Sequence, residues 1–237
     1  MPRAPRPLLR HQHTHVMNRR VDRTPLFESR QEYDEFASLL GWAQREDSVE
    51  ITSWCLMPNH WHLVLRPDDP RQLSSFMHRL ETTHAVGFRS RTGTRGHGSV
   101  YGGRFKSFPI PADRLLRSVV YVERNPVKAG LVQQATAWRH GSAADGGTPT
   151  GWPNVTRLPT ELERLRPDLL TRPLPEEFER EFARWCTNGG DSRRAIDGPA
   201  MHEIRARLDA IDQLRRNAGR AAALQRRRTC AAQRTRG

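Results

Sequence analysis

Residues 51–65 constrain the fold of this chain more than any other stretch, because two apolar segments flank a Pro-Asn pair. The sequence runs ITSWCLMPNHWHLVL, with β-branched, aromatic and aliphatic residues on both sides of that pair. Such segments are typical of buried strands joined by a turn. Side chains alternate between the faces of a strand, so His60 and His62 share one face and Trp61 takes the other. The stretch therefore predicts a hairpin that carries an imidazole pair.

Two imidazoles on one face, about 6–7 Å apart at the backbone, can converge on one metal ion. Two ordinary histidines on a polar strand face are the plainer interpretation of such a pair by itself. His11, His13 and His15 also alternate along a first strand, and there a solvated face is the favoured interpretation over a metal site. The choice for the central pair depends on residues elsewhere in the chain.

Net charge indicates the class of partner. The 237 residues include 39 Lys and Arg against 26 Asp and Glu, a formal charge of +13. Such an excess favours a polyanion, either nucleic acid or an anionic membrane surface. The sequence has no apolar run of transmembrane length and no signal-peptide-like start, so we expect nucleic acid and a cytoplasmic, nucleoid-associated location. The three cysteines are too far apart for a disulfide framework or a CxxC zinc site.

Periodicity predicts the order strand, helix, strand, strand, helix, strand, helix between residues 11 and 140. This order predicts an α+β fold of the ferredoxin-like split βαβ type, with a four-stranded antiparallel sheet and helices on one face. Asp113 is the expected N-cap of the last helix, which should end near Asn125 because Pro126 follows. The other expected elements are strands at 11–16, 49–56, 60–66 and 104–110 and helices from Ser29 to Arg45 and from Asp69 onward.

Composition divides the rest of the chain. Residues 1–10 are a basic, proline-rich stretch expected to be a flexible arm, and 11–140 should form the main domain. Residues 141–157, rich in glycine and proline, are predicted to be a linker. Residues 158–237 should form a basic helical extension, in which a heptad-like stripe runs from Met201 to Ala222. That stripe would serve either as a dimer seam or as a surface docked on the main domain, and monomer and homodimer both remain open.

Tyr121 and Asn125 are four residues apart, so on a helix they lie one above the other. If this helix covers His60 and His62, two imidazoles and one amide oxygen can hold a divalent cation beside a phenol. Mixed nitrogen and oxygen ligands suit Mn²⁺, and Mg²⁺ where oxygens complete the shell. A cation there would act as a Lewis acid on a phosphodiester, and the phenol would form a phosphotyrosine. A packed tyrosine and a helix C-cap are the alternative interpretations of Tyr121 and Asn125.

Four motifs together resemble the REP-associated tyrosine transposases, a subgroup of the single-tyrosine HUH transposases. They are MPNHWHL at 57–63, YVERNPVKAGLV at 121–132, HVMNR at 15–19 and GRFKS at 103–107, and the resemblance covers residues 11–140. It implies metal binding by His60, His62 and Asn125, with Tyr121 as the nucleophile that becomes linked to the 5′-phosphate of cut single-stranded DNA. It also implies that the substrate is a DNA hairpin.

A glycine-rich loop at 92–103 with basic neighbours suggests a segment that contacts a nucleic-acid backbone. The candidate DNA-binding residues are Arg19, Arg91, Arg95, Arg104 and Lys106. Three other functions compete with an active transposase. A replication initiator or relaxase lacks support, because there is no second nearby tyrosine and no third histidine in the motif. A non-catalytic DNA-binding relative would keep the fold, and a basic RNA-binding protein would explain the charge alone.

Overall fold

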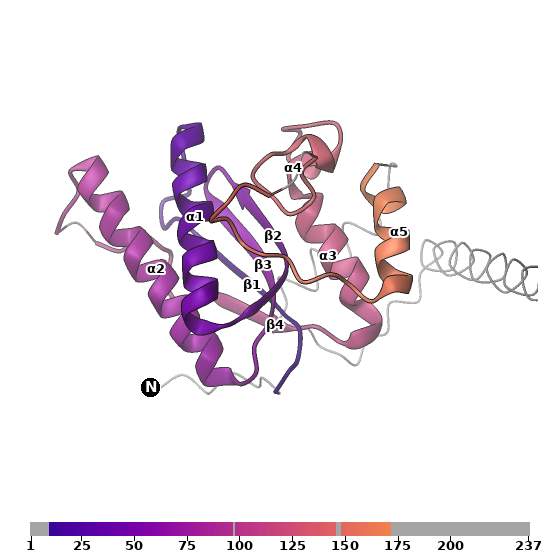
Figure 1. The fold of residues 1–237 in the computed structure, drawn as a ribbon. Helices are drawn as coiled ribbons and strands as arrows, with labels where there is room; N and C mark the ends of the chain where they lie inside the picture. The colour runs from indigo at the N-terminus through magenta and orange to yellow at the C-terminus, as the bar shows by residue number, and fades with distance from the viewer. Residues whose placement is uncertain (1–9, 97, 146–147, 172–237) are drawn as a thin grey trace, which may run out of the picture. The chain divides into compact units, whose positions relative to one another are not determined.

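Four strands form one antiparallel sheet in the computed structural model, which describes residues 10–96, 98–145 and 148–171 (Figure 1). The strand order is β2-β3-β1-β4, so the hairpin of β2 and β3 adds to β1, and β4 closes the other edge. The strands are β1 (Thr14–Arg19), β2 (Glu50–Met57), β3 (His60–Arg66) and β4 (Lys106–Pro109). The arm and the heptad-like stripe predicted from sequence lie outside the described residues.

Local signals set the ends of the two longest described helices. Ser29 caps α1 (Arg30–Asp47) by accepting a hydrogen bond from the Glu32 amide. Asp69 caps α2 (Pro70–Thr92), and Gly93 ends it in the left-handed conformation. The remaining helices are α3 (Leu115–Glu123), α4 (Asn125–Lys128) and α5 (Thr160–Thr171), with 3₁₀ turns at Ala112–Arg114 and Ala135–Ala137. Among the described helices, none is long and apolar enough to cross a membrane.

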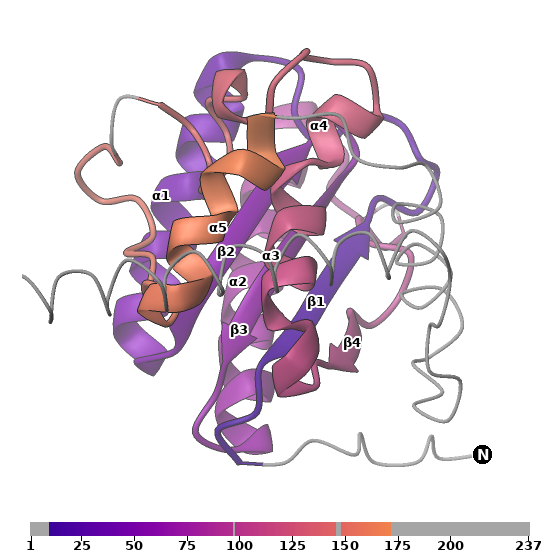
Figure 2. The same cartoon turned by 90° about the vertical axis from the view of Figure 1, so that its right-hand side faces the viewer.

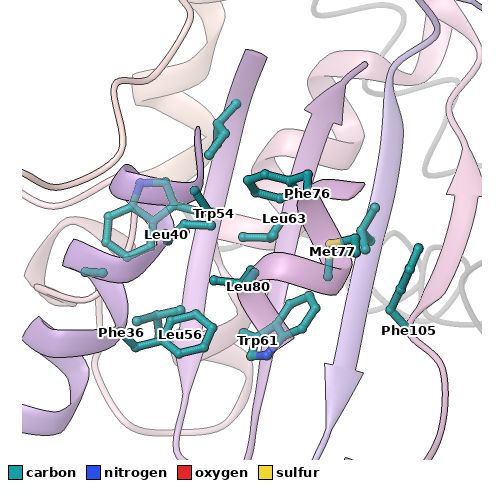
Figure 3. Packing of buried hydrophobic residues seen from close by; sticks show 14 of the residues in the cluster. Phe36, Leu40, Trp54, Leu56, Trp61, Leu63, Phe76, Met77, Leu80 and Phe105 are labelled. Carbon is teal, nitrogen blue, oxygen red and sulfur yellow. The ribbon is translucent and has the colours of Figure 1, made fainter. Parts of the chain in front are cut away.

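The two faces of the sheet carry different helices. Trp61 and Leu63 of β3 belong to the buried apolar cluster that includes Phe36 of α1 and Phe76 of α2 (Figure 3). On the opposite face, the ring of Tyr121 from α3 lies beside the rings of the histidines. The α+β class and the antiparallel sheet are therefore confirmed. The expectation of helices on one face holds for α1 and α2 and is corrected for α3, which covers the other face (Figures 1 and 2).

Two local predictions are also corrected. Asp113 does not cap α3, because it lies in a 3₁₀ turn and the N-cap position is Arg114, which makes no side-chain capping bond. The segment expected to be a linker packs on the domain. Gly41 of α1 lies so close to it that an added Cβ would be 2.2 Å from the Gly151 carbonyl oxygen. Trp152 is 8% exposed and belongs to the apolar cluster, so the close approach of Gly41 has a packing reason.

Candidate active site

The ring of Tyr121 stands edge-on to two buried imidazoles of the sheet. Its centroid lies 6.0 Å from that of His62 and 6.2 Å from that of His15, with interplanar angles of 86° and 81°. His60 is 4.9 Å from His62, ring to ring. The helix and the hairpin, 59 positions apart at His62 and Tyr121, thus bring the predicted tyrosine beside the two motif histidines.

His15 is a site residue that the sequence analysis did not single out. Its side chain is fully buried, stacks on His62 at 13° and places Nε2 2.9 Å from His62 Nδ1. The expectation of a solvated face is therefore wrong for His15. It fits His11 better, whose exposed ring pairs with Asp68 at 3.2 Å. The available signal was the pairing of the first strand with the hairpin, which alternation alone does not reveal.

Burial keeps these imidazoles neutral. It lowers the pKa of His15 to about 3. Burial, aided by the charge of Arg19, lowers the pKa of His60 to about 4. Burial also holds the pKa of His62 well below its ordinary value, and the neighbouring His60, His15, Arg19 and Lys128 act in the same direction. Neutral imidazole is the form that binds a metal ion, so the site has the right protonation state at neutral pH.

Hydrogen bonds at Nδ1 leave the other ring nitrogen of each motif histidine for a ligand. His60 Nδ1 is 2.7 Å from Asn59 Oδ1, so a proton on Nδ1 satisfies this bond and leaves a lone pair on Nε2. For His62, donation from Nδ1 to His15 has the same effect. This outer contact is of the kind that orients metal-binding histidines. The donor set therefore fits a divalent cation bound through Nε2 of both residues.

Asn125 has one side-chain atom, Oδ1, that is available to a metal ion. It is 7% exposed, and Nδ2 donates to the carbonyl oxygens of Tyr121 at 2.9 Å and Val122 at 3.3 Å. The Asn125 amide group therefore binds the last turn of α3, and its Oδ1 is the atom suited to a hard cation. Across the described part of the chain, no three His, Cys, Asp or Glu side chains group as a metal site. A cation between His60 and His62 would accordingly need an oxygen from Asn125, from water or from substrate.

Positive side chains surround this face of the sheet. Lys128 Nζ lies 5.4 Å from the Tyr121 ring centroid, a contact that the sequence analysis did not predict although its i, i+7 spacing was a signal. Arg19 pairs across strands with His60, and Lys106 pairs with Met17, itself the partner of His62. Directly paired residues share a face, so Arg19 and Lys106 stand on the side of the histidines.

The other predicted DNA-binding residues are placed differently. Arg91 lies near the end of α2, 3.2 Å from Glu32 and 3.6 Å from Glu35 of α1. Arg95 donates to the Ser90 hydroxyl at 3.0 Å. Arg104 is exposed in the segment before β4. The structure therefore groups Arg19 and Lys106 with the site and puts Arg91 against acidic residues of α1.

These features define a class of protein domain, an antiparallel α+β sheet on which a helix-borne tyrosine covers a histidine pair. The family model described as "Transposase IS200 like" matches residues 9–125. The match covers just under half of the chain, and over these residues the sequence is similar to the IS200-like transposases.

Solved structures of two transposases resemble the chain. A REP-associated tyrosine transposase bound to a REP hairpin is 22% identical, with a TM-score of 0.47 over 67% of this chain and 95% of its own. A proposed transposase from Deinococcus radiodurans is 14% identical, with a TM-score of 0.38 over 52% of this chain and 97% of its own. Among curated proteins, none matches the sequence significantly.

Proposed function

We propose that this chain is a transposase that cuts and rejoins single-stranded DNA through a covalent link between Tyr121 and a 5′-phosphate. The observation that carries the proposal is the position of the Tyr121 ring, edge-on to the imidazoles of both His15 and His62. A tyrosine whose only role was packing would be expected to be fully buried. Tyr121 is instead partly exposed and lies against buried, neutral histidines. The family match supports a DNA-processing enzyme and leaves the chemistry to this geometry.

The reaction assigns one role to each residue. The Tyr121 phenol oxygen attacks phosphorus, the bond from phosphorus to the 3′-oxygen breaks, and the DNA 3′-hydroxyl leaves with a proton. His60, His62 and Asn125 would hold Mg²⁺ or Mn²⁺, which supplies Lewis-acid stabilisation of the charge on the phosphate oxygens. One phosphoester replaces another, so a new 3′-hydroxyl can attack the phosphotyrosine and join a strand without ATP.

The substrate we propose is single-stranded DNA that contains a REP-like hairpin. The four sequence motifs support this substrate through their resemblance to the REP-associated subgroup. The charges of Arg19, Lys106 and Lys128 on the side of the histidines suit a phosphate backbone that crosses the site. Such a partner also accounts for the formal charge of +13.

The test is covalent capture on hairpin DNA. The full chain, Mn²⁺ or Mg²⁺ and a 5′- or 3′-labelled hairpin oligonucleotide are mixed, and products are separated on a denaturing gel. We expect an adduct that carries only the DNA segment 3′ of the cut. Tyr121→Phe should abolish the adduct while the affinity for DNA changes less than about twofold, because only the phenol oxygen is removed.

Tyr33→Phe is the matched control. Tyr33 of α1 is 8% exposed and belongs to the buried apolar cluster, and its ring stacks on His140, which is outside the proposed site. We expect this variant to form the adduct at the wild-type rate. An adduct of equal yield from Tyr121→Phe would show that another residue is the nucleophile. DNA binding without any adduct from the wild type would instead support a non-catalytic DNA-binding protein.

A further inference from the structure

Helix α5 lies beyond the family match and beside α3, the helix that carries Tyr121, in both views (Figures 1 and 2). The sequence assigned α5 to an extension outside the main domain. Buried contacts nevertheless connect it with the helix that carries the proposed nucleophile. Several of these contacts are polar and buried, so apolar burial alone does not explain them.

A two-pronged ion pair joins the helices. The Arg166 guanidinium donates from Nε to Glu123 Oε2 at 2.8 Å and from Nη2 to Oε1 at 2.5 Å. The Glu123 side chain is 0% exposed and that of Arg166 is 17% exposed. Arg166 also donates to Glu163 at 3.0 Å. Glu123 is two positions from Tyr121, so this pair acts on the same turn of helix that carries the phenol.

Ser142 connects the ion pair to the sheet. Its hydroxyl donates to Glu123 Oε1 at 2.6 Å and accepts from the Trp54 amide at 3.1 Å. The Ser142 amide donates to the Trp54 carbonyl oxygen at 2.9 Å. Trp54 pairs in register with Leu63 of β3, the strand that carries both motif histidines. One polar network therefore runs from the tyrosine helix to β2, the strand that pairs with the histidine strand.

Arg124 adds a second attachment, at the C-terminal end of α5. Its Nη1 donates to the carbonyl oxygens of Leu169 and Leu170, each at 3.2 Å. These carbonyls belong to the last turn of α5, where helix bonds are missing and a cation is favourable. Consecutive residues of the tyrosine helix thus bind α5 at two places.

We propose that the Glu123–Arg166 pair positions Tyr121 over His60 and His62, which makes α5 part of the catalytic unit. The inference rests on the proposed function. A buried ion pair is weak evidence for stability, since desolvation of both charges offsets their attraction. It does fix geometry through two directed bonds. Attack on phosphorus needs such geometry, because a displacement of about 1 Å lowers a rate about 100-fold.

The experiment separates rate from binding and from stability. Single-turnover adduct formation is measured at saturating hairpin DNA, well below the melting temperature, and the affinity for DNA is measured in a Tyr121→Phe background. We expect Arg166→Met to slow adduct formation at least tenfold while the affinity changes less than twofold. Arg166→Lys, which keeps one bond, should recover part of the rate.

Arg79→Met is the matched control. Arg79 of α2 donates to Asp47 of α1 at 2.8 Å, an ion pair between helices on the other face of the sheet. Its loss should leave the rate of adduct formation unchanged. A rate as low as that of Arg166→Met would show that any broken ion pair slows the enzyme, and would overturn the inference.

The double variant Glu123→Gln, Arg166→Met removes both charges and leaves no buried ion without a partner. We expect its melting temperature to return toward that of the wild type while its rate stays low. A rate that recovers with the melting temperature, or an unchanged rate in Arg166→Met, would reduce the pair to a structural role. Absence of an adduct from the wild type would overturn the proposed function and this inference together.

Discussion

The two faces of the sheet differ in what they bury. One face carries Trp61 and Leu63 under α1 and α2 and is dominated by apolar and aromatic contacts. The other carries His15, His60 and His62, and Tyr121 of α3 lies against them. Consecutive residues of one strand serve both faces, because side chains alternate. The three residues of the His-Trp-His motif thus supply apolar packing on one side and the proposed metal ligands on the other.

The difference between the two faces predicts which mutations should change stability and which should change activity. The Trp61 indole is fully buried, and its Nε1 donates to the Tyr101 hydroxyl at 3.4 Å. The same hydroxyl is 2.7 Å from His84 Nδ1 on α2. These bonds tie the middle residue of the motif to the helix layer, away from the reacting groups. We therefore expect changes on the core face to affect stability and changes on the site face to affect chemistry.

The largest expected effect on stability is that of Trp61→Ala. It removes a fully buried indole and leaves a cavity between β3 and the helices, so we expect a loss of about 3–5 kcal/mol. Urea unfolding followed by fluorescence and circular dichroism measures this loss. Any molecules that remain folded should still form the adduct, because both histidines keep their places.

His60→Ala is the comparison on the other face. His60 is only partly buried and belongs to the site, so we expect a loss of about 1 kcal/mol or less together with loss of the adduct. A His60→Ala protein as unstable as Trp61→Ala would show that the two faces do not divide the roles.

Acid should reveal a histidine on the core face. Burial, with a smaller contribution from the Arg91 charge, lowers the pKa of His84 to about 3 from an ordinary 6.5. Its other neighbours are the Tyr101 hydroxyl and the rings of Phe27, Phe36 and Phe88. Below pH 6.5 the unfolded chain binds a proton that the folded chain does not. Keeping His84 neutral therefore costs no free energy of unfolding above that pH. Below it, the free energy of unfolding falls by about 1.4 kcal/mol per pH unit because of His84.

The measurement is the free energy of unfolding between pH 7.5 and pH 5 for the wild type and His84→Gln. We expect a smaller pH slope in the variant, which has no imidazole to protonate. Equal slopes in the wild type and His84→Gln would contradict a neutral, buried His84.

Most of the fold could be predicted from the sequence because its signals are local. Caps at Ser29 and Asp69 and the alternation around Trp61 each specify an element from a few neighbouring residues. Which face α3 covers depends on the path of the chain after β4, which no local pattern encodes. The close packing of Gly151 on Gly41 is also a tertiary feature, and glycine content alone predicted a linker there.

The candidate site divides in the same way. His60, His62, Tyr121 and Asn125 were predictable because a strand period and a helix period each place two of them together. His15 was not, because its role depends on the sheet register that sets it diagonally from His62. Lys128 was not singled out because Pro126 follows Asn125 and suggested that the helix would stop, whereas α4 forms a further helical turn from Asn125 to Lys128.

The smallest expected effect is on DNA affinity, from single positive charges on the two faces of the sheet. Lys106 stands on the face of the histidines, whereas Arg91 is held by Glu32 and Glu35 of α1. We expect Lys106→Ala to weaken hairpin binding less than about tenfold and to lower the slope of log affinity against log salt by about 1. Arg91→Ala is the control and should change neither quantity, because its charge is already balanced by protein carboxylates. An equal loss from Arg91→Ala would mean that DNA also follows the helix side of the sheet. The DNA-binding surface would then extend beyond the face that carries the histidines, and the division between the two faces would hold for chemistry but not for DNA binding.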